Sequence, residues 1–426
     1  MRSAYDIFSE RGFIEQVTDE ELIKELLERE SVTCYIGFDP TATSLHIGSL
    51  VPIMALSHMQ RAGHKPIALI GGGTALIGDP SGKTEMRQIL TRDEIDRNAE
   101  SLKRQLSRYI DFEDNKALLL NNADWLAGLN YIEFLRDIGR HFSVNRMLAA
   151  ESYRMRMETG LNFIEFNYML LQSYDFYYLC KHHDCAIQMG GNDQWGNIVA
   201  GADLTRRLEG KRVYGITFPL LVTSQGHKMG KTEKGTVWLD PDLTPPYEYF
   251  QYWINTEDAD VERFLALFTF LPVEEIRAAS RLTDSEINMA KAVLAFETTK
   301  ITHGEDEAIR AWKASAGAFN LRPVSSDLFP SSSIPRHEIL QDVSAITTYE
   351  KTMKEVEAVP IATLLHEVDL CASRGEARRL ITQGGAYING RQVRSIDDKI
   401  GVDDLDENRE IRLRKGKKKY TIIKVV

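Results

Sequence analysis

The chain has 426 residues, of which 43% are apolar and 27% charged. These proportions are typical of a globular protein of two or three domains and exclude fibrous and disordered classes. No run of 18 apolar residues occurs, so the sequence predicts no membrane-spanning helix. The first 30 residues lack a continuous apolar segment and predict a helical lead-in instead of a targeting peptide. Four scattered cysteines favour a reducing compartment, so we expect a cytoplasmic protein.

The charge is unevenly distributed along the chain. The net charge is −10 overall, yet residues 356–426 hold 14 Lys and Arg against 11 Asp and Glu, a balance of +3. An acidic body with a mildly basic tail suggests that the tail contacts nucleic acid.

From residue 32 to about residue 221, short β-rich runs alternate with longer amphipathic stretches. The expected strands are 33–38, 66–70, 117–121, 185–189 and 216–222. This alternation predicts an α/β fold with a parallel sheet. Glycine-rich segments follow two of the strands directly, at 71–73 and 190–191. We therefore expect a ligand crevice at the carboxyl edge of the sheet, as in nucleotide-binding folds.

Other parts of the chain interrupt or follow that pattern. Residues 122–168 are mostly helical and predict an insertion that could serve dimerisation. Residues 245–318 are rich in helix formers and aromatic residues and predict a separate helical domain. Residues 321–335 have the prolines and serines of a linker.

The last segment changes composition again, from about Pro360. A helix-turn-helix-like stretch with three arginines leads to a short strand at 386–388 and to Asn389-Gly390, a hairpin signal. Residues 373–393 resemble the small RNA-binding fold named after a ribosomal protein of the small subunit. The arginines are Arg374, Arg378 and Arg379, of which the first two stand one helical turn apart and can face one phosphate backbone. A solvated charged face is the alternative interpretation.

Two short clusters carry the strongest functional signal. Residues 46–49 (His-Ile-Gly-Ser) follow a predicted strand and open an apolar helical stretch, which places backbone donors at a helix N-terminus, where phosphate binds. Residues 228–232 (Lys-Met-Gly-Lys-Thr) carry two lysines in a loop, suited to charge developing on a departing polyphosphate. In this order they resemble the HIGH and KMSKS signatures of class I aminoacyl-tRNA synthetases.

Two further clusters suggest other sites. Residues 78–84 resemble a P-loop, but only three residues separate the glycines where four are needed, and Pro80 removes a backbone donor. Lys83 and Arg87 are still four apart and suited to a polyphosphate. Cys180, His182, His183 and Cys185 are metal-capable, but their spacing fits a helix end better than a zinc site.

Four longer segments indicate which of the class I synthetases the chain resembles. Residues 35–41 (Tyr-Ile-Gly-Phe-Asp-Pro-Thr), 78–83 (Gly-Asp-Pro-Ser-Gly-Lys), 168–175 (Tyr-Met-Leu-Leu-Gln-Ser-Tyr-Asp) and 190–197 (Gly-Gly-Asn-Asp-Gln-Trp-Gly-Asn) resemble the tyrosyl-tRNA synthetases of bacterial type, and the similarity runs through essentially the whole chain.

The resemblance implies a domain order that agrees with the composition. A Rossmann-like catalytic domain (1–225) with a helical insertion (about 122–168) precedes a KMSKS-like loop and connection (226–244). An α-helical anticodon-binding domain (245–320), a linker (321–355) and a small α+β RNA-binding domain (356–426) follow.

The resemblance also implies a tyrosine pocket. Asp175 would accept the proton of the substrate hydroxyl and Tyr35 would supply a second hydrogen bond. Phenylalanine would leave both unpaired, a principle for which this family is itself a standard example. Asp79, Tyr168 and Gln172 would hold the α-ammonium. Tyr168, Gln172 and Asp175 are spaced by four and three residues, which puts these polar groups on one face of a helix. In an ordinary buried helix face, the three groups would each need a hydrogen-bond partner in the core.

For ATP, the resemblance implies a second group of residues. Gly37, Asp39, His46 and Gly48 would contact adenosine and phosphates, Asp193 the ribose, and Gln194 the reacting carboxylate. Thr41 and His46 would donate to phosphate oxygens, and Lys83, Arg87, Lys228 and Lys231 would meet the departing pyrophosphate. Mg²⁺ is expected with ATP, without a dedicated protein site. The tyrosine carboxylate would attack the α-phosphorus, so positioning and electrostatics suffice for catalysis.

Some positions depart from the usual motifs. Ser49 replaces the second histidine of HIGH, Gly230 and Thr232 replace serines of KMSKS, and Ile36 stands where a ribose-contacting cysteine is often found. Ser49 can still donate a hydrogen bond, whereas Ile36 cannot.

The expected partners are L-tyrosine, tRNA(Tyr) and a second copy of the chain, with no membrane. Three alternatives compete with this interpretation. A tryptophanyl-tRNA synthetase shares the fold, but an indole offers no hydroxyl for Tyr35 and Asp175. An inactive RNA-binding protein would have no reason to keep His46, Lys83, Asp175, Lys228 and Lys231 together. A nucleotidyltransferase acting on another acid would not need the RNA-binding tail.

Overall fold

The computed structural model describes most of the chain. The described residues are 2–81, 90–224, 226, 229–232, 235–279, 281–282, 286–319, 324–325, 327–336, 348–401, 404–406, 409–416 and 419–426. Lys83, Arg87 and Lys228, three of the predicted site residues, lie outside them, as does the side chain of Lys231.

A six-stranded sheet forms the centre of the N-terminal domain, in the order β1-β6-β5-β2-β3-β4. The strands are β1 (Gln16–Val17), β2 (Thr33–Phe38), β3 (Lys65–Ile70), β4 (Leu118–Asn121), β5 (Cys185–Gly191) and β6 (Tyr214–Phe218). The five predicted strands are present and mutually parallel. Strand order reverses between β2 and β5, which is where an open parallel sheet opens a crevice at its carboxyl edge.

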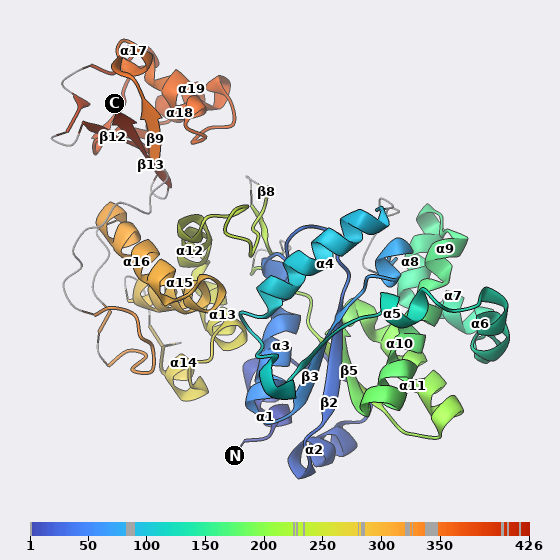
Figure 1. Cartoon of the computed structure of the whole chain (residues 1–426). Helices are drawn as coiled ribbons and strands as arrows, with labels where there is room; N and C mark the ends of the chain where they lie inside the picture. Colours follow the sequence, from blue (N-terminus) through green and yellow to red (C-terminus); the bar gives the residue numbers. More distant parts are fainter. Residues whose placement is uncertain are drawn as a thin grey trace.

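Helices cover both faces of this sheet (Figure 1). They are α1 (Ala4–Arg11), α2 (Glu20–Arg29), α3 (Leu50–Arg61), α4 (Arg92–Leu106), α10 (Tyr168–His183) and α11 (Trp195–Glu209). A short 3-10 turn, η1 (Ile47–Ser49), precedes α3. The strands β2 and β3 are buried along most of their length, because a parallel sheet with helices on both faces has no solvent-facing side.

The region 122–168 is helical, as the sequence predicts. Its helices are α5 (Ala123–Leu126), α6 (Tyr131–Asp137), α7 (Val144–Ala149), α8 (Glu151–Thr159) and α9 (Phe163–Phe166). They pack with α10 and α11 around a separate hydrophobic cluster that includes Phe134 and Tyr153. Figure 1 shows this insertion at the end of the molecule opposite the later domains.

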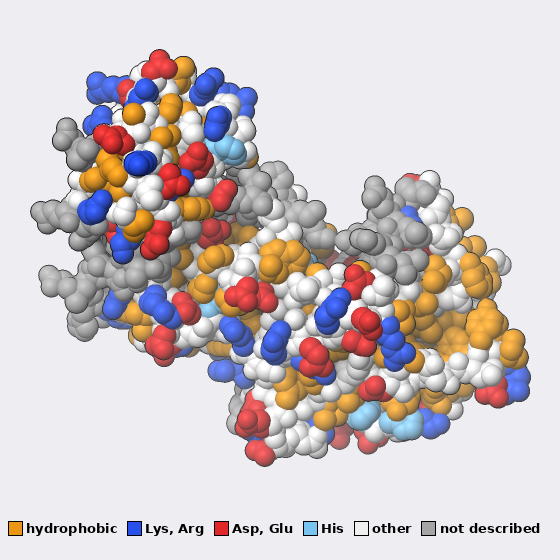
Figure 2. All heavy atoms as spheres, turned by 45° about the horizontal axis from the view of Figure 1, so that its top comes forward, with side chains coloured by type: hydrophobic (Ala, Val, Ile, Leu, Met, Phe, Trp, Pro, Cys, Tyr) orange, Lys and Arg blue, Asp and Glu red, His pale blue; other side chains and the backbone are white. Residues whose placement is uncertain are grey.

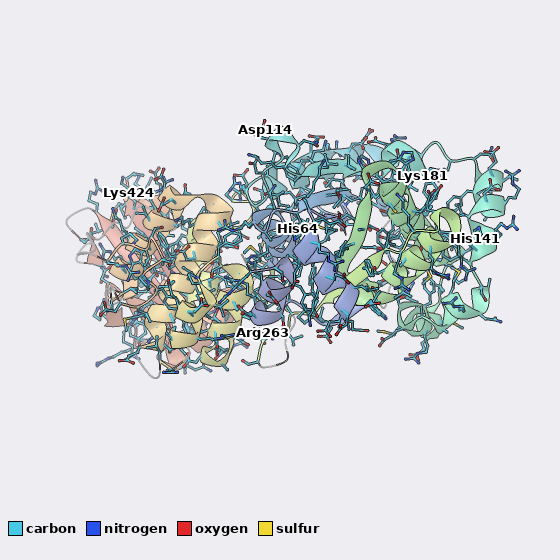
Figure 3. All side chains as sticks on the ribbon, turned by 90° about the horizontal axis from the view of Figure 1, so that it is seen from below. His64, Asp114, His141, Lys181, Arg263 and Lys424 are labelled. Carbon is cyan, nitrogen blue, oxygen red and sulfur yellow. The ribbon has the colours of Figure 1, made fainter. Side chains whose placement is uncertain are left out.

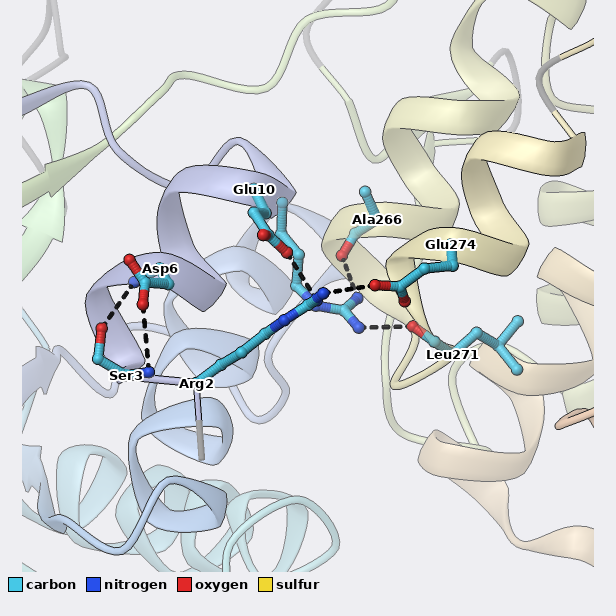
Figure 4. A network of polar contacts seen from close by, with 8 residues as sticks. Arg2, Ser3, Asp6, Glu10, Ala266, Leu271 and Glu274 are labelled. Atoms are coloured by element: carbon cyan, nitrogen blue, oxygen red, sulfur yellow. Dashed lines mark hydrogen bonds and ion pairs between the residues drawn. The ribbon is translucent and has the colours of Figure 1, made fainter.

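A helical domain follows, made of α12 (Pro246–Ile254), α13 (Val261–Phe268), α14 (Val273–Ala279), α15 (Ile287–His303) and α16 (Glu305–Phe319). It shares one core with the N-terminal domain. Buried Arg11 of α1 donates to the carbonyl oxygens of Ala266, Thr269 and Leu271 at 2.5–2.9 Å, and burial lowers the pKa of Arg11 to about 10. Beside it, Arg2 joins Glu10 and Glu274 (Figure 4). These bonds link the two domains.

The C-terminal domain contains a five-stranded sheet in the order β11-β10-β12-β13-β9. The strands are β9 (Thr348–Lys351), β10 (Ala386–Ile388), β11 (Arg391–Gln392), β12 (Glu410–Lys415) and β13 (Lys419–Val425), and the helices are α17 (Met353–Val356), α18 (Ile361–Glu367) and α19 (Arg374–Thr382). Asn389 and Gly390 form the two-residue turn of the predicted hairpin, with φ of 45° and 82°. This domain has a core of its own.

The segment before it packs on the helical domain. Phe329 and Ile334, in the stretch whose composition predicts a linker, are buried in the shared core. The molecule is elongated, with His141 of the insertion and Lys424 of β13 near opposite ends (Figure 3). Within the described ranges, no helix is long and apolar enough to cross a bilayer.

Candidate active site

A cavity of about 490 Å³ opens at the carboxyl edge of the sheet. It lies where β2 and β5 diverge, and both glycine-rich segments border it at Gly71 and at Gly190 with Gly191. Of the residues predicted for tyrosine and ATP, the cavity is lined by Tyr35, Gly37, Asp39, Thr41, His46, Gly48, Asp79, Tyr168, Gln172, Asp175, Asp193 and Gln194. Segments from five parts of the chain therefore meet in one cavity.

The closed end of the cavity is built around Asp175. Its two carboxylate oxygens accept hydrogen bonds from Trp125 Nε1 at 2.7 Å and Asn122 Nδ2 at 2.9 Å. Asn122 is itself fixed, because its Oδ1 accepts from the Gly73 backbone N–H at 2.7 Å. Trp125 stacks on Tyr178 of α10 at 4.3 Å between ring centroids. The carboxylate is thus held in one orientation by the insertion and α10.

Tyr35 lies at the same closed end. Its hydroxyl is buried and has no hydrogen-bond partner among the described residues. Burial, with a smaller contribution from the Asp175 charge, raises the pKa of Tyr35 well above its usual value, so the phenol stays protonated. Burial also raises the pKa of Asp175 to about 7, although the bonds from Asn122 and Trp125 oppose the change. A buried hydroxyl without a described partner, beside a buried and oriented carboxylate, is complementary to a polar ligand group.

Asp79 is a second buried carboxylate that lines the cavity. Its oxygens accept from the Ser81 N–H and from Gln194 Nε2, each at 2.8 Å. Burial, and then the nearby charge of Asp39, raise the pKa of Asp79 to about 6. A carboxylate held at this cost is stabilised by a cationic ligand group, which would restore its ordinary pKa.

Side chains of α10 and α11 connect Asp79 to the rest of the site. Gln172 Nε2 donates to Gln194 Oε1 at 3.1 Å, and Asn197 Nδ2 donates to Gln172 Oε1 at 2.9 Å. The Tyr168 hydroxyl donates to Asp39 Oδ2 at 3.0 Å. Tyr168, Gln172 and Asp175 all reach the cavity from one face of α10, as their spacing predicts.

The open end of the cavity carries the first signature segment. His46 caps η1 in an extended conformation, with φ of −122° and ψ of 170°. Its ring covers Gly48 so closely that a Cβ at Gly48 would lie 2.7 Å from the imidazole. Only glycine therefore allows the imidazole and the helix N-terminus to line the cavity together.

The second signature segment lies against the first. The Ile47 N–H donates to the Val237 carbonyl at 3.1 Å, the Leu239 N–H donates to the Leu45 carbonyl at 2.9 Å, and the His46 ring meets Trp238 edge-on. Gly230 takes a left-handed φ of 84°, and its backbone approaches Gly48. A glycine in place of the usual serine suits this turn, since left-handed φ disfavours other residues.

Sequence reasoning missed several functional residues. Asn122 follows strand β4 at the same sheet edge as the other polar groups, and that position was the available signal. Trp125, Asn197 and Trp238 reach the cavity or its polar groups through tertiary contacts, and no local pattern marks them. At the cluster of Cys180, His182, His183 and Cys185, helix α10 ends at His183, and Asp184 takes a left-handed conformation. Among the described residues, no group of three His, Cys, Asp or Glu side chains lies close enough to hold a metal ion.

Comparisons with known proteins give the chain's family. Residues 27–320 match the family model described as tRNA synthetases class I (W and Y), and residues 338–423 match the SYY-like C-terminal domain of tyrosine–tRNA ligase.

Two curated relatives match over nearly their whole length. Tyrosine–tRNA ligase of Syntrophus aciditrophicus is 64% identical over 100% of this chain and 99% of its own, and that of Desulfosudis oleivorans is 59% identical over 99% of both. A crystal structure of a C-terminally truncated mitochondrial tyrosyl-tRNA synthetase from Aspergillus nidulans has a TM-score of 0.66 and 31% identity over 73% of this chain and 93% of that one. With the site described above, these matches show that the chain belongs to the tyrosyl-tRNA synthetases of class I.

Proposed function

We propose that this chain activates L-tyrosine with ATP, forming tyrosyl-adenylate and pyrophosphate, and then transfers tyrosine to the 3′ end of tRNA(Tyr) with release of AMP. The observation that carries the proposal is the closed end of the cavity, where the unpartnered Tyr35 hydroxyl and the oriented Asp175 carboxylate stand together. These groups fit a phenol, which donates to Asp175 and accepts from Tyr35. A benzyl ring would offer no hydrogen bond to either group, and an indole has no hydroxyl oxygen to accept from Tyr35.

The α-ammonium of tyrosine would bind at Asp79, Tyr168 and Gln172. Asp79 has the raised pKa that a bound cation relieves, and Gln172 is held by Asn197 and Gln194. Asp79 and Asp175 both line the one cavity, so ammonium and phenol have separate carboxylates. This arrangement directs the tyrosine carboxylate toward Gln194 and the open end of the cavity.

Adenylate formation needs positioning more than acid–base chemistry. A carboxylate oxygen of tyrosine bonds to the α-phosphorus of ATP as the bond to the bridging oxygen breaks, and that electron pair leaves with pyrophosphate. Gly37, Asp39, Gly48 and Asp193 would hold adenosine and ribose. Thr41 and His46 would donate to phosphate oxygens that gain charge.

The cations of the two loops would act on the departing pyrophosphate. Lys83, Arg87, Lys228 and Lys231 are assigned here by the sequence motifs. The described part of the lysine loop supports this, because Gly230 lies against Gly48 at the open end of the cavity. Mg²⁺ would arrive bound to the ATP phosphates, since no group of three metal-capable side chains gathers among the described residues.

The later domains would bind tRNA. Arg374, Arg378 and Arg379 are exposed on α19, whose amphipathic face packs Ala377 and Ile381 into the C-terminal core. Three arginines on one exposed helix suit a phosphate backbone. We assign residues 1–225 to catalysis, with residues 226–244 as the KMSKS-like loop and connection. Anticodon binding is assigned to 245–320 and further RNA binding to 356–426.

A second copy of the chain would bind the insertion. Figure 2 shows a broad hydrophobic area at the end of the molecule where the insertion lies. The exposed apolar side chains there include Tyr131, Ile132, Val144, Met155, Met157 and Phe163. Such a contiguous apolar area is typical of a protein interface. A homodimer would cover it, and one tRNA would then reach both subunits.

A cytoplasmic location agrees with four buried, unpaired cysteines.

Acylation of tRNA(Tyr) tests the whole reaction. The chain, with ATP, Mg²⁺ and labelled tyrosine, is expected to form a base-labile ester on tRNA(Tyr) and on no other tRNA. Replacing Arg374, Arg378 and Arg379 with glutamine should raise KM for tRNA at least tenfold without changing amino-acid activation. Arg391→Gln is the control, because Arg391 is also exposed but paired with Asp404. Failure to charge any tRNA would contradict the proposal.

Light scattering tests the dimer. The wild type should have twice the chain mass. The double substitution of Ile132 and Phe163 by aspartate should give monomers, because two charges would be buried at the interface. A monomeric wild type at micromolar concentration would contradict the dimer without affecting the proposed chemistry.

A further inference from the structure

Helix α4 lies beside the open end of the cavity and contributes a side chain that no motif predicts. Gln105 is 7% exposed and points at the segment between β2 and the first signature. Its Oε1 accepts from the Leu45 N–H at 2.9 Å and from the Ser44 hydroxyl at 3.2 Å, while Nε2 approaches the Thr43 carbonyl at 3.4 Å. One amide side chain thus binds three consecutive residues immediately before His46.

A second amide on the same face of α4 extends this contact. Asn98 stands two turns before Gln105 and is also 7% exposed. Its Nδ2 donates to the Pro40 carbonyl at 3.0 Å. The two amides therefore hold both ends of the segment 40–45, which contains Thr41 and leads into His46. Leu102, between them on α4, lines the cavity itself.

The bound segment also contacts residues 239–240, which follow the lysine loop. Ser44 Oγ accepts from the Asp240 N–H at 3.2 Å, and the Leu45 carbonyl accepts from the Leu239 N–H at 2.9 Å. Ser44 is 4% exposed, so its hydrogen bonds are made with the protein and not with bulk water. Gln105, through Ser44 and Leu45, thus fixes both signature segments relative to each other.

Helix α4 is anchored beyond the site. After its last turn, Arg108 donates to the Thr302 carbonyl at 2.6 Å and the Tyr109 hydroxyl donates to Thr302 Oγ1 at 2.8 Å. Thr302 belongs to α15 of the helical domain, and Figure 1 shows α4 running from that domain across the catalytic domain. The amides therefore project from a helix whose position is set by two domains.

We propose that Gln105 is a positioning residue for adenylate formation: it holds residues 43–45 so that Thr41, His46 and the lysine loop meet the ATP phosphates in one geometry. This role rests on the proposed function. It concerns the ATP end of the cavity, since the hydrogen bonds of Gln105 among the described residues run to residues 43–45. A buried amide that binds a loop backbone fixes catalytic groups without touching substrate.

The test is Gln105→Met, which keeps length and removes both polar atoms. In tyrosine-dependent exchange of pyrophosphate into ATP, kcat/KM for ATP should fall by about ten- to a hundredfold, because the buried Leu45 N–H loses its partner and the loop moves. KM for tyrosine should stay within twofold. Gln105→Glu keeps the acceptor oxygen and should recover most of the loss.

Gln60→Met is the matched control. Gln60 binds the Asp111 backbone with both amide atoms, at 2.6 and 3.0 Å, and belongs to neither the cavity lining nor the bound segment. It should lose stability without a change in the exchange parameters. Thermal unfolding of each variant verifies that it is folded at the assay temperature.

Equal loss with ATP and tyrosine, or no loss, in Gln105→Met would overturn the positioning role. If Gln105→Met is unfolded, Ser44→Ala replaces it, with the same ATP-selective loss expected and its absence equally decisive. An inactive wild type would instead overturn the proposed function, and the positioning role with it.

Discussion

Trp125 offers the sharpest test of how the closed end of the cavity recognises a phenol. Trp125→Phe removes the indole N–H that donates to Asp175 at 2.7 Å but keeps a ring to stack on Tyr178. A hydrogen bond to a charged group contributes about 1.5–3 kcal/mol. One pKa unit corresponds to about 1.4 kcal/mol, so the pKa of Asp175 should rise from about 7 to about 8 or above.

The expected result follows from the protonation of Asp175. At pH 7 the variant carries a mostly neutral carboxyl, so KM for tyrosine should rise about tenfold while KM for ATP stays within twofold. The pH at which KM for tyrosine reaches its minimum should move upward by about one unit. Pyrophosphate exchange between pH 6 and 9 measures both quantities.

Trp312→Phe is the control for the indole substitution itself. Trp312 is buried in the helical domain, and its Nε1 has no hydrogen-bond partner within the described ranges. The control should leave KM for tyrosine unchanged at every pH. If Trp125→Phe also leaves KM for tyrosine within twofold from pH 6 to 9, the hydrogen bond from Trp125 does not set the protonation state of Asp175, and the reasoning is refuted.

Three further predictions use other parts of the structure. The pKa of Asp175 is raised from 3.8 to about 7, so its contribution to stability is present below pH 4 and lost as pH rises to 7. The unfolding free energy of the wild type, measured in urea titrations, should therefore fall by about 3 kcal/mol between pH 5 and 8 on account of this group. Asp175→Asn should lack that fall. Gly48→Ala should push the His46 ring aside and lower kcat for exchange at least tenfold, with circular dichroism unchanged. Arg11→Met should leave three buried carbonyls unpaired and destabilise the domain junction by about 2–4 kcal/mol in urea unfolding, and a loss below 0.5 kcal/mol would contradict its anchoring role.

The sheet and its ligand edge were predictable because their signals are local. Each parallel strand is a short β-rich run, and glycines follow β3 and end β5 at the cavity. Strand β1 was missed because it has only two residues, Gln16 and Val17, and pairs antiparallel at the edge through β6. Two residues are too short for an alternating pattern, and tertiary pairing alone makes them a strand.

The candidate site was predictable only in its motif residues. Gln105, Trp125 and Asn197 each act by binding another site residue. Their partners are Leu45, Asp175 and Gln172, which lie 60, 50 and 25 positions away in the sequence. Such contacts depend on how helices pack, and a single sequence carries no periodic signal for them. The lysine motif gave Lys228 and Lys231 their proposed role, and that role stays a prediction.

The most direct test of the central claim is pyrophosphate exchange with tyrosine, phenylalanine and tryptophan side by side, on wild type and Asp175→Ala. The account predicts exchange with tyrosine alone, and its loss in the variant, because only a phenol satisfies both Tyr35 and Asp175. Exchange supported by tryptophan or phenylalanine as well as by tyrosine, or full activity in Asp175→Ala, would contradict it.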